Sequence, residues 1–221
     1  RYGLQEPASA VTACQLLLAL SPHMAHASVR DEWATLLTTG WQAAQAAGEP
    51  ATALRIAVEL GELSRQMGKL NEAEGRLAQA WALRQPHDDP ALIGRILHRR
   101  AYLFSQRGDR VEALYLAEEA VRLLAPGTAE WAMAQFTLGV VLIRLHNLGS
   151  AEEHLKIASE TWVVLEYRFE YALCIQNLGR VARISGDWGK AHSLYLEACA
   201  VLEELERDHD RSIVILNIGA N

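Results

Sequence analysis

Apolar residues recur along this 221-residue chain at helical spacings of three and four, and turn-forming residues interrupt them at regular intervals. The interrupting turns are "MGKL" (67–70), "RGDR" (107–110), "HNLG" (146–149) and "SGDW" (185–188). Apolar positions at i, i+3, i+4 and i+7 are typical of amphipathic helices, and we find no segment with the alternation of a strand. The pattern predicts an all-α fold with about ten helices and the start of one more.

The helices are organised in an internal repeat, because small residues return in phase four times. The first small position holds Gly61, Ala101, Gly139 and Gly179, which gives spacings of 40, 38 and 40 residues. Twelve residues later come Ala73, Ala113, Ala151 and Ala191, and seven further on Ala80, Ala120, Ala158 and Ala198. The same register continued from Ala198 reaches Gly219, so residues 211–221 are predicted to begin the first helix of a further repeat.

A close crossing of two helices explains why these positions are small. Only glycine or alanine lets two backbones approach within a helical hairpin, and a leucine at Ala73 or Ala151 should overpack the crossing by about 1–3 kcal/mol. Gly68, Gly108 and Gly186 stand where a helix C-terminus needs a left-handed residue. His146 takes that place in the third copy and should destabilise the turn slightly.

A single hairpin cannot bury both of its faces, so consecutive hairpins are expected to stack into a solenoid. Residues 1–50 are predicted to form an atypical hairpin from helices near Pro7–Leu20 and Ser28–Ala47. Four full repeats are then expected over residues 51–90, 91–128, 129–168 and 169–210, followed by the incomplete helix 211–221. The long apolar run Trp131–Ile143 ends at Arg144, which favours a buried helix over a membrane span.

The pattern resembles the tetratricopeptide repeat, with a small residue at position 8, alanine at positions 20 and 27, and an aliphatic or aromatic residue at position 24. Position 24 is held by Leu77, Ala117, Leu155 and Tyr195. The period near 40 is similar to the variety found in kinesin light chains, spindle-orientation adaptors and STAND-type bacterial regulators. The resemblance covers residues 51–221 firmly and 7–50 loosely. It implies a right-handed superhelical solenoid of antiparallel helix pairs that binds proteins or peptides without catalysing a reaction.

In that family the first helices line an inner groove, chiefly through positions 2, 5, 9, 12 and 13. In this chain those positions hold six arginines and one glutamate, Glu62. Because arginine donates two parallel hydrogen bonds to a carboxylate, the resemblance implies a basic groove that binds an acidic segment. The candidate ligand-binding residues are Arg55, Arg65, Arg95, His98, Tyr102, Phe136, Arg144, Gln176, Asn177, Arg180 and Arg183. Asn177 and Asn217, at position 6, are expected to hold a peptide backbone, and the apolar third repeat is expected to form a groove floor.

The composition argues against other partners. The formal charge is -6, which does not favour nucleic acid or an anionic membrane. The three cysteines lack metal-ligand spacing and are interpreted as buried thiols in the cytoplasm. The tryptophans at helix ends and hairpin junctions, Trp41, Trp81 and Trp188, are interpreted as packing residues.

A search for catalytic chemistry finds no Walker A loop, zinc-protease helix, nucleophile elbow or dinucleotide fingerprint. His23 and His26 are interpreted as surface histidines in a loop after Pro22, and the acids beside His154 as partners of a helix N-terminus. We therefore expect no catalytic residue, metal or cofactor.

A second, weaker resemblance links residues 16–68 to the junction between the ATPase half and the repeat arm of STAND-type regulators. It implies that the chain is the sensing arm of a larger signalling or transcription regulator. Three alternatives remain open: a pocket for a small anionic effector, a structural scaffold that dimerises through the incomplete C-terminal hairpin, and RNA binding by the arginines. Against RNA binding, Tyr102 and Phe136 are the only aromatic residues at the groove positions.

Overall fold

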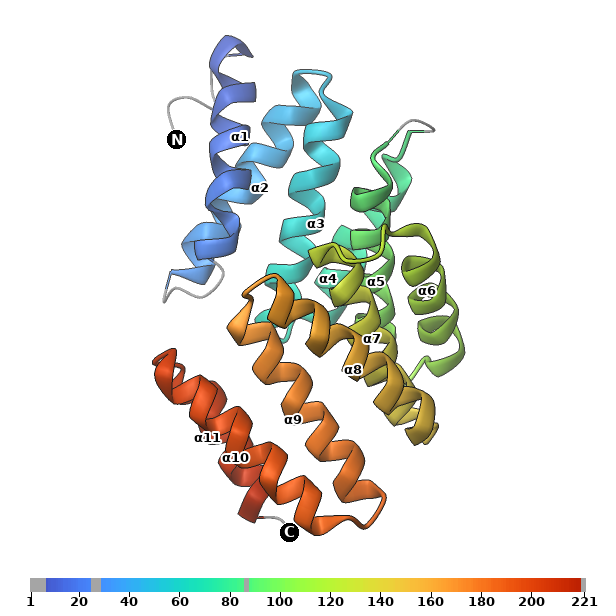
Figure 1. Cartoon of the computed structure of the whole chain (residues 1–221). Coiled ribbons are helices and arrows are strands. Elements are labelled where there is room, and N and C mark those ends of the chain that lie inside the picture. The colour runs from blue at the N-terminus through green and yellow to red at the C-terminus, as the bar shows by residue number, and fades with distance from the viewer. Residues whose placement is uncertain (1–6, 25–28, 86–87, 220–221) are drawn as a thin grey trace. The chain divides into compact units, whose positions relative to one another are not determined.

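The computed structural model describes residues 7–24, 29–85 and 88–219 (Figure 1). Within these ranges the chain forms helices and no strands, which confirms the all-α fold. The helices are α1 (Pro7–Met24), α2 (Arg30–Ala46), α3 (Pro50–Gln66), α4 (Leu70–Ala82), α5 (Pro90–Arg107), α6 (Arg110–Leu123), α7 (Ala129–Arg144), α8 (Leu148–Val164), α9 (Arg168–Ile184), α10 (Trp188–Glu204) and α11 (Asp208–Gly219).

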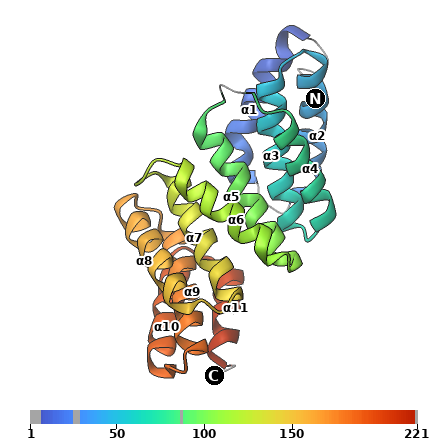
Figure 2. The same cartoon turned by 90° about the vertical axis from the view of Figure 1, so that its right-hand side faces the viewer.

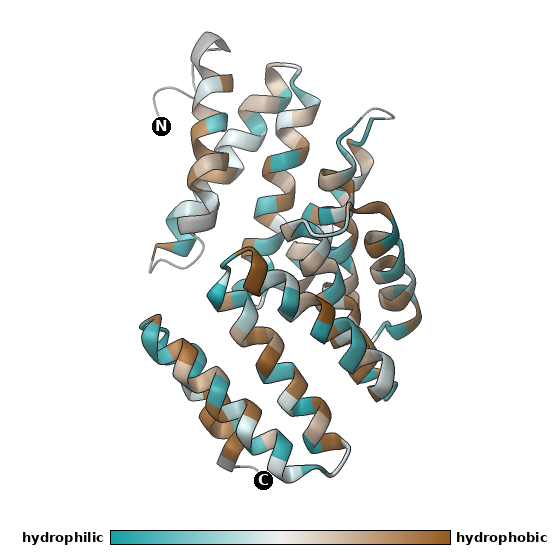
Figure 3. Cartoon of the chain, viewed as in Figure 1, coloured by the Kyte–Doolittle hydropathy of each residue, from teal (hydrophilic) through white to brown (hydrophobic). Residues whose placement is uncertain are grey.

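The chain divides into two compact units, with unit 1 comprising Arg1–Leu103 and unit 2 comprising Phe104–Asn221. The division falls inside α5. Brown apolar and teal polar residues alternate along most helices in Figure 3, as the helical periodicity predicted.

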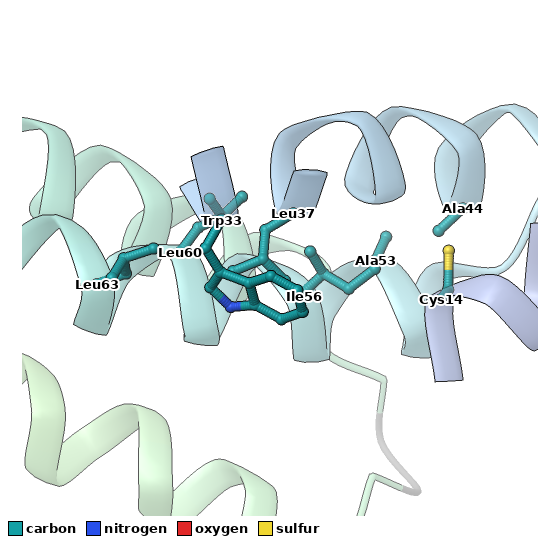
Figure 4. Close-up of a cluster of buried hydrophobic side chains, with 8 residues drawn as sticks. All are labelled: Cys14, Trp33, Leu37, Ala44, Ala53, Ile56, Leu60 and Leu63. Atoms are coloured by element: carbon teal, nitrogen blue, oxygen red, sulfur yellow. The ribbon is translucent and has the colours of Figure 1, made fainter. Parts of the chain in front are cut away.

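In unit 1, α1 packs on α2 and α3, α2 packs on α3, and α3 packs on α4. Figure 4 shows one core cluster, in which Trp33 and Leu37 of α2 meet Ile56 and Leu60 of α3. All four side chains are at most 4% exposed. Each buried side chain of this kind contributes about 1.5–3 kcal/mol of hydrophobic stabilisation, so the atypical first hairpin is firmly attached to α3.

In unit 2 each helix from α6 to α11 packs on the next one, and α7 also contacts α9. The consecutive helices α8, α9 and α10 lie side by side in Figure 2. In α7 every residue from Ala134 to Ile143 is buried, which confirms that the long apolar run is a core helix. None of the helices in the described ranges is long and apolar enough to span a membrane.

The small positions lie at close helix crossings, as predicted. A Cβ atom on Gly139 of α7 would lie 2.7 Å from Leu155 Cγ of α8, and one on Gly179 of α9 would lie 2.8 Å from Tyr195 Cε1 of α10. Real Cβ atoms essentially never approach other atoms so closely. Position 24 therefore packs directly over the glycine at position 8, and the repeated small residues have a steric cause.

The turns between the two helices of a repeat use left-handed residues. Gly68, Gly108 and Gly186 have φ of 75°, 95° and 82°, and His146 has φ of 58°, so the predicted role of His146 is confirmed. Glu166 and Glu206 also adopt positive φ, in the turns from α8 to α9 and from α10 to α11. Because neither turn has a glycine at that position, the sequence did not predict a left-handed residue there. A non-glycine residue in this region costs about 1 kcal/mol, so these three turns are held by their surroundings.

Three expectations about single residues need correction or comment. Helix α1 continues through Pro22 to Met24, so the predicted loop at His23 is wrong, and His26 lies outside the described residues. Trp188 is the first residue of α10 and is 54% exposed, so it is not a packing residue. Cys14 and Cys174 are buried thiols, whereas Cys199 is partly exposed, and all three are free.

Candidate peptide-binding face

The first-helix face is the set of side chains at positions 2, 5, 9, 12 and 13 of α3, α5, α7 and α9. Its part in unit 1 carries an ion pair between neighbouring turns of α3. Arg65 Nε and Nη2 donate to Glu62 Oε2 and Oε1 at 3.0 and 2.6 Å, and the Arg65 guanidinium lies 4.9 Å from the centre of the Tyr102 ring. The two ionic side chains are only 21% and 19% exposed. Arg65 is thus neutralised within the protein.

The electrostatics of this pair follow from its burial. Burial alone would raise the pKa of Glu62, but the hydrogen bonds and charge of Arg65, together with the charge of Arg99, outweigh it and lower the pKa to about 2. Burial also opposes the charge of Arg65, yet the contact with Glu62 raises its pKa overall. Both groups therefore remain charged at neutral pH, and each stabilises the other.

A second network joins α3 to α5. Arg95 Nη1 lies 3.7 Å from Glu59 Oε1, and Arg99 Nη1 lies 3.3 Å from the same oxygen. Arg99 Nη1 also donates to the Val58 carbonyl at 3.1 Å. Glu59 and Arg99 both occupy position 6, which the groove positions omit, so the sequence reasoning missed them. The sequence could have indicated them, because Asn177 was recognised as a candidate at the same position 6 of α9.

The remaining candidates of unit 1 are dispersed. Arg55 is exposed on the second turn of α3. His98 is 5% exposed inside the stack, and Tyr102 is half-buried under Arg65. Since Glu59 and Glu62 are surrounded by guanidinium groups, this part of the face is mainly an internal charge network. Position 6 adds one glutamate, Glu59, and one arginine, Arg99, to the count of six arginines and one glutamate, and leaves the net charge unchanged.

In unit 2 the third repeat is apolar but closed. Phe136, Val140 and Ile143 of α7 are 9%, 4% and 1% exposed. These side chains lie inside the helix stack and do not form the open floor that the sequence suggested. Arg144, on the last turn of α7, donates through Nη1 to the Ser105 carbonyl at the end of α5 at 2.5 Å. A cation at that place stabilises the negative end of a helix dipole.

The candidates on α9 are half-buried and polar. Asn177 Nδ2 donates to the Leu173 carbonyl of its own helix at 2.8 Å. Gln176, Arg180 and Arg183 line the same helix at intermediate exposure. The Nε atom of Arg183 is buried and has no hydrogen-bond partner among the described residues. The face positions of α7 and α9 hold three arginines, Arg144, Arg180 and Arg183, and no carboxylate.

No group of three or more histidine, cysteine or acidic side chains in the described ranges is arranged to hold a metal ion. His154, beside the acids of α8, donates a hydrogen bond through Nδ1 to Gln135 Oε1 at 2.6 Å. Burial lowers the pKa of His154, against the charges of Glu153 and Glu118. His154 therefore joins α8 to α7, and its role is in packing.

Residues 131–204, which run from α7 to α10, match the family model of the tetratricopeptide repeat. Within residues 131–204 the chain carries tetratricopeptide repeats. The matched residues are those in which Gly139 and Gly179 pack under Leu155 and Tyr195, so the family pattern and the steric pattern coincide. No curated protein sequence matches the chain.

Solved structures with tetratricopeptide-like repeats share the fold of a larger part of the chain. BtubC (BKLC) from P. vanneervenii is 20% identical, with a TM-score of 0.70 over 88% of this chain and 83% of that one. A putative kinesin light chain with nearly identical TPR-like repeats from Podosopora anserina is 18% identical, with a TM-score of 0.62 over 87% and 96%. The Rap protein complexed with competence and sporulation factor is 13% identical, with a TM-score of 0.69 over 93% and 69%. At these identities the likeness concerns the fold.

Proposed function

We propose that this chain is a non-catalytic interaction module that holds an acidic protein segment on the first-helix face of unit 2. The observation that carries the proposal is the set of three arginines at the face positions of α7 and α9, two helices in contact. Arg144, Arg180 and Arg183 occupy their face positions, where no carboxylate is present. Acidic residues gather instead on the second helices, for example Glu153 and Glu197.

The chemistry of the arginines favours a carboxylate ligand. A guanidinium group presents a planar fork of donors that matches a carboxylate, and its hydrogen bonds to an ionised acceptor are about twice as strong as neutral ones. Arg180 and Arg183 both lie on α9, at intermediate exposure. Gln176 and Asn177, on the same helix, add neutral amides for a peptide backbone. The similar Rap structure was solved with a bound factor, which supports a binding role for this fold.

Changing Arg180 or Arg183 to alanine is expected to weaken the binding of a Glu- and Asp-rich dodecapeptide. A lost charge-assisted hydrogen bond costs about 1.5–3 kcal/mol, so each variant should bind about tenfold more weakly or worse. Isothermal titration calorimetry at low and high salt measures the effect, and binding by the unmodified protein should itself weaken with salt.

The matched control is Arg122→Ala on α6, whose side chain is 73% exposed on a second helix and pairs with Glu119 there. Its affinity should equal that of the unmodified protein. Equal affinities for all four proteins would contradict the proposal. Complete displacement of the peptide by inorganic phosphate would instead favour the alternative of a small anionic effector.

The finer hypothesis of a sensing arm in a STAND-type regulator rests on the resemblance of residues 16–68. It predicts that the same open reading frame encodes a phosphate-binding loop of the G-x-x-x-x-G-K-[ST] type ahead of these repeats. A reading frame without such a loop would remove this part of the proposal and leave the interaction module intact.

A second proposal concerns self-association through α11, which exposes Ile213, Ile215 and Leu216 by 43%, 48% and 72%. A contiguous apolar surface of this kind favours contact with another protein surface. Leu216→Glu is therefore expected to reduce concentration-dependent dimer formation in sedimentation velocity by more than tenfold in affinity, because a buried carboxylate without a partner is costly.

Leu16 of α1 provides the control, since it is also exposed, by 59%, but lies in unit 1. Leu16→Glu should leave the dimer unchanged. A protein that sediments as a monomer at every concentration, or a dimer that tolerates Leu216→Glu, would rule out this interface.

A further inference from the structure

Unit 2 also contains a cleft, and none of its lining residues belongs to the first-helix face. This open cleft of about 590 Å³ is bounded by the C-terminal ends of α8 and α10 and by the first turn of α9. Its lining residues are Trp162, Val163, Glu166, Arg168, Tyr171 and Val201. This volume falls within the range of about 300–1,000 Å³ that is usual for ligand sites in proteins.

The apolar surface of the cleft continues onto the outside of the protein. Val163 and Val164, the last two residues of α8, are exposed by 59% and 82%, and Tyr167, which precedes α9, is exposed by 48%. The Tyr167 ring packs against Trp162 with centroids 5.4 Å apart, so the two aromatic side chains are fixed. Exposed aliphatic and aromatic side chains next to a cleft are typical of a surface that binds another protein.

The charged groups around the cleft are mainly acidic. Arg168 lines it, but its Nη2 atom lies 2.5 Å from Glu204 Oε2. The Tyr171 hydroxyl donates to Glu197 Oε1, and Glu166 lines the cleft directly. Burial, followed by the hydrogen bond to Glu197, raises the pKa of Tyr171 to about 12, so the phenol stays neutral. Three carboxylates and one guanidinium leave the rim with a net negative charge.

We propose that this cleft binds a basic amphipathic segment of another protein, which inserts one large apolar side chain between Val163 and Val201 and places lysine or arginine beside Glu166 and Glu197. The apolar lining favours the side chain and the rim favours the flanking positive charges. The first-helix face has the opposite charge, so unit 2 presents two surfaces that select partners of opposite sign. The two sites share no residue.

The unusual backbone at Glu166 is consistent with this role. Glu166 has φ of 61°, a conformation in which glycine would be less strained, yet a carboxylate occupies the rim there. Glu166→Gly therefore removes a rim charge and relieves the backbone at the same time. This substitution separates binding from folding, because its effects on the two have opposite directions.

The experiment measures fluorescence anisotropy of a labelled pool of nonapeptides with Leu, Phe or Trp at the centre and Lys or Arg on both sides. The unmodified protein should bind the pool saturably and should not bind a matched pool with Glu in place of every Lys and Arg. Val163→Arg should weaken binding at least tenfold, because it fills the cleft mouth and repels the flanking charges. Val111→Arg, on the exposed outer side of α6 (84% exposed for Val111), is the matched control and should change affinity less than twofold.

Glu166→Gly should weaken the basic pool several-fold while its thermal unfolding midpoint rises. Arg180→Ala and Arg183→Ala should leave the basic pool bound as before, which distinguishes this site from the first-helix face. Absence of saturable binding, equal losses in Val163→Arg and Val111→Arg, or equal affinity for the acidic pool would each overturn the proposal.

Discussion

Replacing Glu62 by glutamine should lower the free energy of unfolding of the protein by about 3 kcal/mol or more. Removing one partner of a buried ion pair leaves the other charge without compensation, which typically costs 3–5 kcal/mol. The partner here is Arg65, whose guanidinium stays protonated at neutral pH. Its side chain is only 21% exposed, so water compensates the remaining charge poorly. Urea denaturation followed by circular dichroism and tryptophan fluorescence measures the loss.

The same pair predicts a pH dependence with a definite sign. The pKa of Glu62 is lowered from 4.5 to about 2 in the folded protein. Its contribution is therefore fully present above pH 4.5 and is lost as the pH falls toward 2, since the unfolded chain takes up the proton first. In the Glu62→Gln protein the stability should vary less with pH across this interval.

The control for both measurements is Glu72→Gln, because Glu72 is exposed on the first turn of α4. This variant should stay within about 0.5 kcal/mol of the unmodified protein, and its pH profile should be parallel. If Glu62→Gln and Glu72→Gln lost the same stability, or if both retained the full acid dependence, the buried pair would not have the role described.

The repeat architecture could be predicted from the sequence because it depends on one short-range steric rule. Gly139 and Ala151 stand twelve residues apart within one hairpin, so their spacing encodes the helix crossing directly. Left-handed turns at Gly68 and Gly186 were visible for the same local reason. Glu166 and Glu206 were not, since nothing in a glutamate marks a positive φ.

The charges of the candidate face were harder to predict, because they depend on pairs that join different repeats. Glu59 and Arg99 are separated by 40 residues and meet only because position 6 of α3 faces position 6 of α5. A repeat register read across consecutive helices would have found this pair. No sequence pattern indicated that Phe136 and Ile143 are buried, since their burial depends on how the neighbouring side chains fill the space.

The cleft with the acidic rim could not be predicted from the sequence pattern either. Its walls, Val163 and Val201, stand on two second helices that the repeat rule treats as equivalent outer surfaces. Whether the space between such helices is filled depends on individual side-chain sizes, and periodicity carries no information about them. A hollow of this kind becomes visible only when both helices are placed in three dimensions.

Replacing Gly139 by valine should destabilise the protein by about 3 kcal/mol, at the upper end for overpacked cores. A Cβ atom there would lie 2.7 Å from Leu155 Cγ and 3.3 Å from the Ala151 carbonyl oxygen, and Leu155 is fully buried. This loss of stability is expected even though valine has a better helix propensity than glycine. Gly149→Val is the control, because a Cβ atom on Gly149 meets nothing within 4 Å, and it should be neutral or slightly stabilising.

A double-mutant cycle tests the steric explanation more directly than either single change. Leu155→Ala alone opens a cavity and should cost about 2–5 kcal/mol. Combined with Gly139→Val, it also removes the atoms that the new side chain meets. The loss of unfolding free energy in the double variant should therefore be smaller than the sum of the two single losses by at least 1 kcal/mol. Strict additivity in urea unfolding would mean that Gly139 is required for some reason other than the approach of α8, and the explanation of the repeated small residues would then fail at its best-defined crossing.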